Sequence, residues 1–231
     1  MSATSKTLLE RIIDFKNKVI LPVSVETLRL LPDGVVLGTF VLAILGMCQS
    51  YCVLLLTMFE LMLGQRALAM IISGIAPIGA GENALQEVCQ PGFSFPNAMR
   101  ISLLETIGTP SSFPSPVMFF LTGLISYILG CINQFGREIN SFGGDIGMRT
   151  TVAVVLSSLF VFAMLAFRYT YGCESFGSLM VSLILGIIVG ILIVFQNLAV
   201  FGRQGINILN LPMIQPIGAG TPMFVCAPTG T

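Results

Sequence analysis

The sequence predicts an all-α membrane protein that crosses a lipid bilayer about four times. Two features of the composition point to this class: 55% of the 231 residues are hydrophobic, and only 10% are charged. A soluble domain usually carries about a quarter charged residues, which keep its surface in contact with water. The third feature is the arrangement of the charges, because they leave four apolar runs that are long enough to span a bilayer.

Each apolar run approaches or exceeds the roughly 20 residues that a helix needs to cross a hydrocarbon core of about 30 Å. Charged residues border the runs, as Glu60 and Arg137 do, because one charge buried at mid-bilayer costs about 2.5 to 3.5 kcal/mol. The expected organisation is an N-terminal segment 1–33, a transmembrane region 34–201 with spans at 35–59, 117–135, 150–167 and 176–201 and a long loop 60–116, and a tail 202–231.

One further apolar stretch, Ala67–Gly81, is too short and too rich in glycine to be counted as a span, and it contains Pro77. We interpret it as a helix extension or as a re-entrant or interfacial piece, with a further span as the less favoured alternative. The rest of the long loop holds a short helical candidate, Asn97–Ile107, and is expected to form an ordered cap or to contact another protein.

The distribution of Lys and Arg predicts the orientation of the four spans. Eight of the eleven basic residues fall on the side of the N-terminal segment, the loop 136–149 and the tail. Because cytoplasmic loops carry the excess of Lys and Arg, we expect both termini on the cytoplasmic side.

The N-terminal segment has the pattern of an amphipathic helix. Thr7 and Glu10 have the spacing of a capping box, and Pro22 is expected to end the helix. Such a helix could lie on the membrane, dock into a partner protein or pack on its own bundle. The tail contains four prolines and is expected to be extended. The apolar face of the helix, the candidate partner-docking surface, consists of Leu8, Ile12, Phe15 and Val19.

A stripe of small residues runs along the fourth span, where Ser178, Ser182, Gly186 and Gly190 recur every four residues. Residues at this spacing share one face of a helix. Helices in membranes associate by close van der Waals approach, which small residues permit. The stripe therefore predicts a helix-packing seam, against a neighbouring span or against another subunit.

Six cysteines are spread along the chain without a CxxC pair, which argues against a zinc site. Cys89 and Cys173 fall on the same, non-cytoplasmic side of a four-span protein, so they could form a disulfide in an oxidising lumen. Cys48 and Cys52 lie one turn apart in the first span and are interpreted as small buried hydrophobic residues.

No enzyme is expected, because the chain has no His and contains no recognisable catalytic motif. Neither catalytic, cofactor-binding nor metal-ligating residues can be assigned. The net charge of zero argues against a nucleic-acid partner. A channel or transporter usually has ionisable residues in mid-span, and the four expected spans have none. Their amides, such as Gln196 and Asn197, are expected to tie helices together.

Five short motifs lie between Arg137 and the C-terminus: Arg149-Thr-Thr, Gly172-Cys173-Glu174, Gln196-Asn197, Phe201-Gly-Arg-Gln-Gly-Ile-Asn207 and Phe224-Val-Cys226. In these motifs this part of the chain resembles uncharacterised membrane proteins of large icosahedral double-stranded DNA viruses that infect algae and protists. In place of an acidic residue and Ser in the motif after the last span of that family, this chain has Gln204 and Gly205.

The resemblance implies a minor capsid protein, a structural protein of the virion, that anchors the icosahedral capsid to an inner membrane derived from the host endoplasmic reticulum. Its expected partners are the lipid bilayer and other capsid or virion proteins, in a homo-oligomer or hetero-oligomer. The alternative function is a small channel or transporter subunit.

Overall fold

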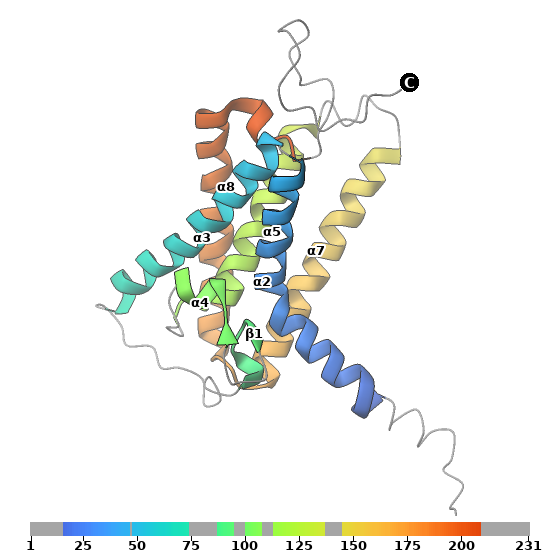
Figure 1. Ribbon diagram of the computed structural model, residues 1–231, viewed down its shortest axis with the longest axis vertical. Helices are drawn as coiled ribbons and strands as arrows, with labels where there is room; N and C mark the ends of the chain where they lie inside the picture. The colour runs from blue at the N-terminus through green and yellow to red at the C-terminus, as the bar shows by residue number, and fades with distance from the viewer. Residues whose placement is uncertain are drawn as a thin grey trace, which may run out of the picture.

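The computed structural model describes residues 16–46, 48–73, 87–94, 100–107, 113–136 and 145–208. Helices make up most of this part of the chain (Figure 1), and the two short strands pair antiparallel with Phe93 opposite Ile101. In chain order the elements are η1 (Lys16–Ile20), α2 (Leu21–Gly46), α3 (Gln49–Ser73), η2 (Glu87–Cys89), β1 (Phe93–Ser94), β2 (Arg100–Ile101), α4 (Leu103–Ile107), α5 (Pro116–Gln134), α7 (Asp145–Thr170) and α8 (Phe176–Gly205).

Five of the described helices, α2, α3, α5, α7 and α8, are long and apolar enough to cross a membrane. The protein is therefore an all-α, multi-pass membrane protein, as expected, with five candidate spans where about four were expected. Three of the predicted spans correspond to α5, α7 and α8. The remaining span, 35–59, is divided between two helices.

The division falls where α2 ends at Gly46 and α3 begins at Gln49. The carbonyl oxygen of Cys48 accepts hydrogen bonds from the backbone N–H groups of Tyr51 and Cys52, at 3.1 and 3.2 Å, which starts the new helix. Only the uncharged Gln49 and Ser50 interrupt the apolar run here, so no charge marks the turn in the sequence. The hydrophobic pattern alone could not separate the two helices.

The helix α3 continues past Glu60, which was expected to border a span, and ends at Ser73. The interpretation of the 67–81 stretch as a helix extension is thus confirmed for residues 67–73, while residues 74–81 lie outside the described part. The short helix expected at Asn97–Ile107 is present only as α4, since residues 100–101 form β2.

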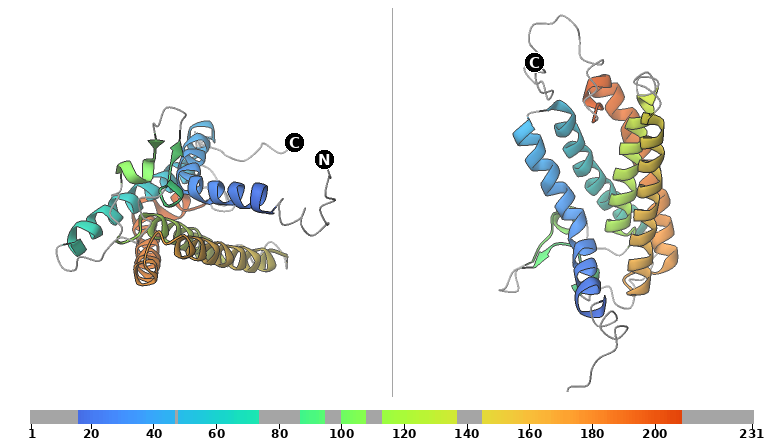
Figure 2. Two further views of the ribbon diagram at one scale, coloured as in Figure 1. Left: turned by 90° about the horizontal axis from the view of Figure 1, so that it is seen from below. Right: turned by 90° about the vertical axis from the view of Figure 1, so that its right-hand side faces the viewer.

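The helices α5 and α8 pack against each other along their length and form the centre of the bundle. Phe119, Phe120 and Tyr127 of α5 and Leu179 of α8 are completely buried there. The helix α7 leans away from this pair (Figure 2). Only 11% of the residues in its most apolar stretch are buried inside the protein. Most of its side chains are therefore left to face lipid.

The helix α2 begins at one end of the bundle and α8 ends at the other (Figure 1). Asp33 of α2 bonds to α4 at the first end, and Arg203 of α8 bonds to the carbonyl oxygen of Gln134, at the far end of α5. Five candidate spans would put the two ends of the described bundle on opposite sides of a membrane. The expectation of both termini on one side depended on four spans, and the termini themselves lie outside the described residues.

Pro22 does not end a helix, as was expected, because α2 runs from Leu21 through it. A proline in the first turn costs little, since the N–H that it lacks would have no partner within the helix. Pro32, which lies inside α2, does remove an internal hydrogen bond, and the helix changes direction part-way along (Figure 1).

Candidate functional site

The short elements η2, β1, β2 and α4 gather at one end of the bundle, beside the turn between α7 and α8 (Figure 1). We call this assembly, residues 87–94, 100–107 and 171–175, the cap. It is built from the loop that was expected to be ordered. A disulfide joins its two parts, two sets of polar contacts attach it to the membrane helices, and a further set holds the start of α5 beside it.

The first attachment is a disulfide between Cys89 in η2 and Cys173 in the turn after α7, with a Cα–Cα distance of 5.2 Å. Both cysteines are buried. The structure thus contains the bond that the sequence suggested. The bond joins parts of the chain that are 84 residues apart.

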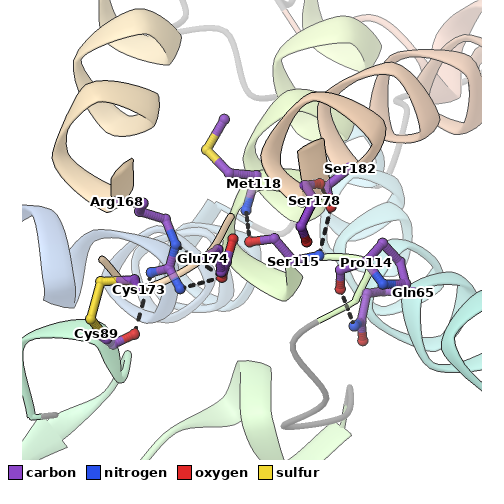
Figure 3. A network of polar contacts seen from close by, with 10 residues as sticks. All are labelled: Gln65, Cys89, Pro114, Ser115, Met118, Arg168, Cys173, Glu174, Ser178 and Ser182. Carbon is purple, nitrogen blue, oxygen red and sulfur yellow. Dashed lines mark hydrogen bonds and ion pairs between the residues drawn. A yellow bond between two sulfur atoms is a disulfide. The ribbon is translucent and has the colours of Figure 1, made fainter. Parts of the chain in front are cut away.

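The second attachment is a buried ion pair between Arg168, near the end of α7, and Glu174 (Figure 3). The Arg168 Nη2 and Nε atoms donate to Glu174 Oε1 at 2.5 and 3.2 Å. The Nη1 atom donates to the carbonyl oxygen of Cys89 at 3.3 Å. Both side chains are less than a tenth exposed, so the guanidinium links the cap to α7 without contact with water.

The third attachment joins α2 to α4 through Asp33, which is fully buried. Its Oδ1 atom accepts from the backbone N–H groups of Leu103 and Leu104, at 2.9 and 3.0 Å, and its Oδ2 atom accepts from the Ser102 hydroxyl at 2.9 Å. The first N–H groups of a helix have no partner within the helix, and a carboxylate is favoured beside them. Asp33 therefore caps α4 from another helix.

The fourth set of contacts does not involve the cap itself and lies where α5 begins (Figure 3). The backbone N–H of Ser115 donates to Ser182 Oγ at 2.6 Å, and the Ser182 hydroxyl donates to the carbonyl oxygen of Ser178 at 2.7 Å. Gln65 of α3 donates to the carbonyl oxygen of Pro114 at 2.9 Å. The entry to α5 is thereby held by both α3 and α8.

The predicted packing seam, Ser178, Ser182, Gly186 and Gly190, is buried along its whole length. It faces α5 of the same chain: a Cβ atom added at Gly186 would lie 2.6 Å from the carbonyl oxygen of Phe119, and one at Gly190 would meet the backbone of Gly123. Ser182 also binds the N-terminal end of α5, a role that its small size did not predict.

The other predicted residues have varied positions. Leu8, Ile12 and Phe15 lie outside the described residues, and Val19 lies in η1 with 44% of its surface exposed. Cys48 is buried, as was expected, but it is disulfide-bonded and not a free thiol. Cys52 is a free and exposed cysteine. Since Cys48 occupies the turn between α2 and α3, it lies at the end of the bundle opposite the cap.

A polar cluster inside the bundle was missed by the sequence reasoning. Asn197 of α8 donates to Thr57 Oγ1 of α3 and to the hydroxyl of Tyr127 of α5, at 2.8 and 3.1 Å. Gln196 donates to Glu60 Oε1 at 2.9 Å. The two amides do tie helices together, as expected. Glu60 was taken for the border of a span, so its place in the middle of α3 was not foreseen.

No protein-family model matches this chain, and the comparisons with curated proteins and with solved structures found no match. The resemblance to viral membrane proteins therefore stays a prediction from the sequence. Within the described residues, no group of three or more His, Cys, Asp or Glu side chains could hold a metal ion. What the geometry does provide is a cap with a fixed shape, held at one end of a membrane bundle.

Proposed function

We propose that this protein is a structural membrane protein that anchors the icosahedral capsid of a large DNA virus to an inner membrane derived from the host endoplasmic reticulum. The helices hold it in the bilayer, and the parts outside the bilayer bind capsid or other virion proteins. It acts by binding and not by catalysis. The resemblance in sequence supplies the class of virus, and the structural support comes from two further features.

The observation that carries the proposal is the presence of oxidised cysteines at both ends of the bundle. Cys89 and Cys173 are bonded in the cap, and Cys48 is disulfide-bonded in the turn at the other end. In an ordinary cellular membrane one face meets the reducing cytosol, where disulfides are rare. Oxidation at both faces suits a membrane that is enclosed in a particle and leaves the cytosol.

The second support is the construction of the cap. A contact surface whose shape is fixed before binding loses less conformational entropy when a partner binds. The disulfide, the Arg168–Glu174 ion pair and the hydrogen bonds of Asp33 fix the cap in this way. The cap is therefore suited to hold a partner protein in a set position relative to the membrane.

The test begins with purified virus particles treated with detergent that removes loosely held lipid and membrane proteins. The protein should stay with the capsid, and mass spectrometry without reduction should find Cys48 and the Cys89–Cys173 pair oxidised. In particles made with a Cys89→Ser, Cys173→Ser variant, the amount retained should fall several-fold. The matched control, Cys52→Ser, replaces a free cysteine and should leave retention unchanged.

Complete release of the wild-type protein by detergent would contradict the anchoring function. Equal retention of the double variant and the wild type would contradict the role of the cap. Finding Cys48 reduced in mature particles would remove the argument from oxidation at both faces.

The channel or transporter alternative has weaker support. One cavity of about 370 Å³ lies among α5, α7 and α8, and another of similar size lies between α5 and α8. Both are lined mainly by apolar side chains, such as Leu129, Val161 and Phe195. A path for ions needs polar groups or carbonyl oxygens along its length. Ion flux through liposomes that contain the purified protein would establish the channel function instead.

A further inference from the structure

Glu60 is an ionisable residue in the middle of a membrane-spanning helix. It lies twelfth among the 25 residues of α3. A charged group at that depth is costly, so such residues are rare in membranes and usually face another protein group or a bound ion. The contact that Glu60 makes is the hydrogen bond from Gln196 Nε2 to its Oε1 atom, at 2.9 Å.

The contacts of Asn197, the next residue of α8, continue this cluster. Its side chain is completely buried, and its Nδ2 atom donates to Thr57 and to Tyr127. Thr57 precedes Glu60 by one helical turn of α3. Two adjacent residues of α8 thus bind two residues on one face of α3, and the tyrosine joins them from α5.

Two oxygen atoms in this cluster are buried without a hydrogen-bond partner, Glu60 Oε2 and Asn197 Oδ1. An unsatisfied polar atom costs several kcal/mol in a bilayer core, because no water is present to replace the missing bond. Both atoms are acceptors. A hydrogen-bond donor or a cation could satisfy either atom, but only a cation would also offset the negative charge of the Glu60 carboxylate.

We propose that the Glu60–Asn197 cluster is an intramembrane binding site for a small monovalent cation, either Na⁺ or a proton. The carboxylate is the negative group, and the Asn197 carbonyl with the hydroxyls of Thr57 and Tyr127 supplies neutral oxygen atoms. Oxygen ligands of this type suit hard cations. This site is independent of the anchoring function and would exist whether or not the protein binds a capsid.

The charge of the surroundings favours a single positive charge. The titratable groups near the cluster on α5 are Tyr127 and Cys131, which are neutral in their usual forms. On α8 the nearest charged residue is Arg203, which is seven residues after Gln196 and donates to the carbonyl oxygen of Gln134. On α2, Asp33 is engaged with α4 at the cap end. One carboxylate therefore neutralises one cation, whereas a divalent ion would need further acidic ligands.

The test uses the full-length protein in liposomes and an apolar carbodiimide, which reacts with protonated carboxyl groups. Mass spectrometry measures the labelling of Glu60 over a range of pH, with Na⁺ replaced by choline at constant ionic strength. If Na⁺ binds, labelling should slow about tenfold at a concentration ten times its Kd, because the cation competes with the proton. The control carboxylate is Glu26, which is about half exposed and should show no sodium-specific protection.

A second measurement compares the melting temperature of the wild type with that of Glu60→Gln, which keeps an acceptor for Gln196 but has no negative charge. Sodium-specific stabilisation of the wild type alone assigns the site to Na⁺. Labelling that depends on pH but not on sodium assigns it to a proton. Two results together would overturn the proposal. The first is that Glu60 is not labelled, or that its labelling changes with neither pH nor sodium concentration. The second is that the melting temperatures of the wild type and Glu60→Gln depend on pH and sodium in the same way.

Discussion

Arg168 is the residue on which most of the attachment of the cap depends, because its guanidinium reaches both Glu174 and the carbonyl oxygen of Cys89. Burying two charges is expensive, so the value of such a pair lies less in net stability than in position. The planar guanidinium donates in several directions at fixed angles, which a lysine could not do. This residue therefore sets how α7 meets the cap.

Glu174→Ala should destabilise the protein by about 3 to 5 kcal/mol, because it leaves the Arg168 guanidinium buried without its counter-charge. The double variant Arg168→Met, Glu174→Leu should lose clearly less, since no unpaired charge remains. Unfolding in detergent micelles measures both effects. A double variant as unstable as the single one would show that the ion pair itself, and not the burial of an unpaired charge, determines stability at this site.

Asp33→Ala should free the cap from α2, because three hydrogen bonds to Ser102, Leu103 and Leu104 are lost together. Each buried donor left without a partner costs about 1 to 3 kcal/mol. Hydrogen exchange should then speed up in α4 and remain slow in α5. Asp33→Asn is the control, because its remaining oxygen can still accept from the helix N-terminus. Unchanged exchange in α4 after Asp33→Ala would contradict the capping role.

Among the helices, the closest contact is that between α5 and α8. A Cβ atom added at Gly190 would lie 3.0 Å from the carbonyl carbon of Gly123 and still closer to its oxygen. Real Cβ atoms do not approach backbone so closely, so the two helices would have to separate. The absence of a side chain at Gly190 is thus what permits the contact.

Gly190→Ala should destabilise the bundle by about 1 to 3 kcal/mol, in the range of other overpacked sites. Gly177→Ala lies in the same helix, where an added Cβ atom meets nothing within 4 Å, and it should be neutral or slightly stabilising. Thermal unfolding of the two variants in micelles makes the comparison. Equal stability of the two would mean that α5 and α8 can move apart without cost.

The sequence predicts some of these elements well and others not at all. The spans at α5, α7 and α8 are bordered by charges, and the small-residue stripe repeats with the helical period, so both are visible in the sequence. The break at Gly46 has no charged border, so the sequence reads as one uncharged run across it. The partners of Asp33 and Glu60 are also hidden, since they depend on contacts between residues far apart in the chain.

For the whole molecule, the odd number of crossings gives a direct test of orientation. Thr106→Cys in the cap and Gln204→Cys near the end of α8 should react with impermeant thiol reagents from opposite sides of sealed vesicles. Both positions are exposed. The background protein should carry serine at Cys52 and Cys131, the free cysteines of the described residues. Reaction of both sites from the same side would mean that one of the five helices does not cross the bilayer.

The length of α5 sets the bilayer that the molecule fits. Its 19 residues span about 28 Å, and both ends are fixed, by Ser182 at Ser115 and by Arg203 at Gln134. The helix cannot lengthen to match a thicker membrane, so the bilayer around it would have to become thinner. The length of α5 is close to the hydrocarbon thickness of endoplasmic reticulum membranes, roughly 27 Å. It is further from that of plasma membranes, about 32 to 33 Å. The protein should therefore be most stable in bilayers of short-chain lipids, and in cells it should partition into thin membranes and away from thick, sterol-rich ones.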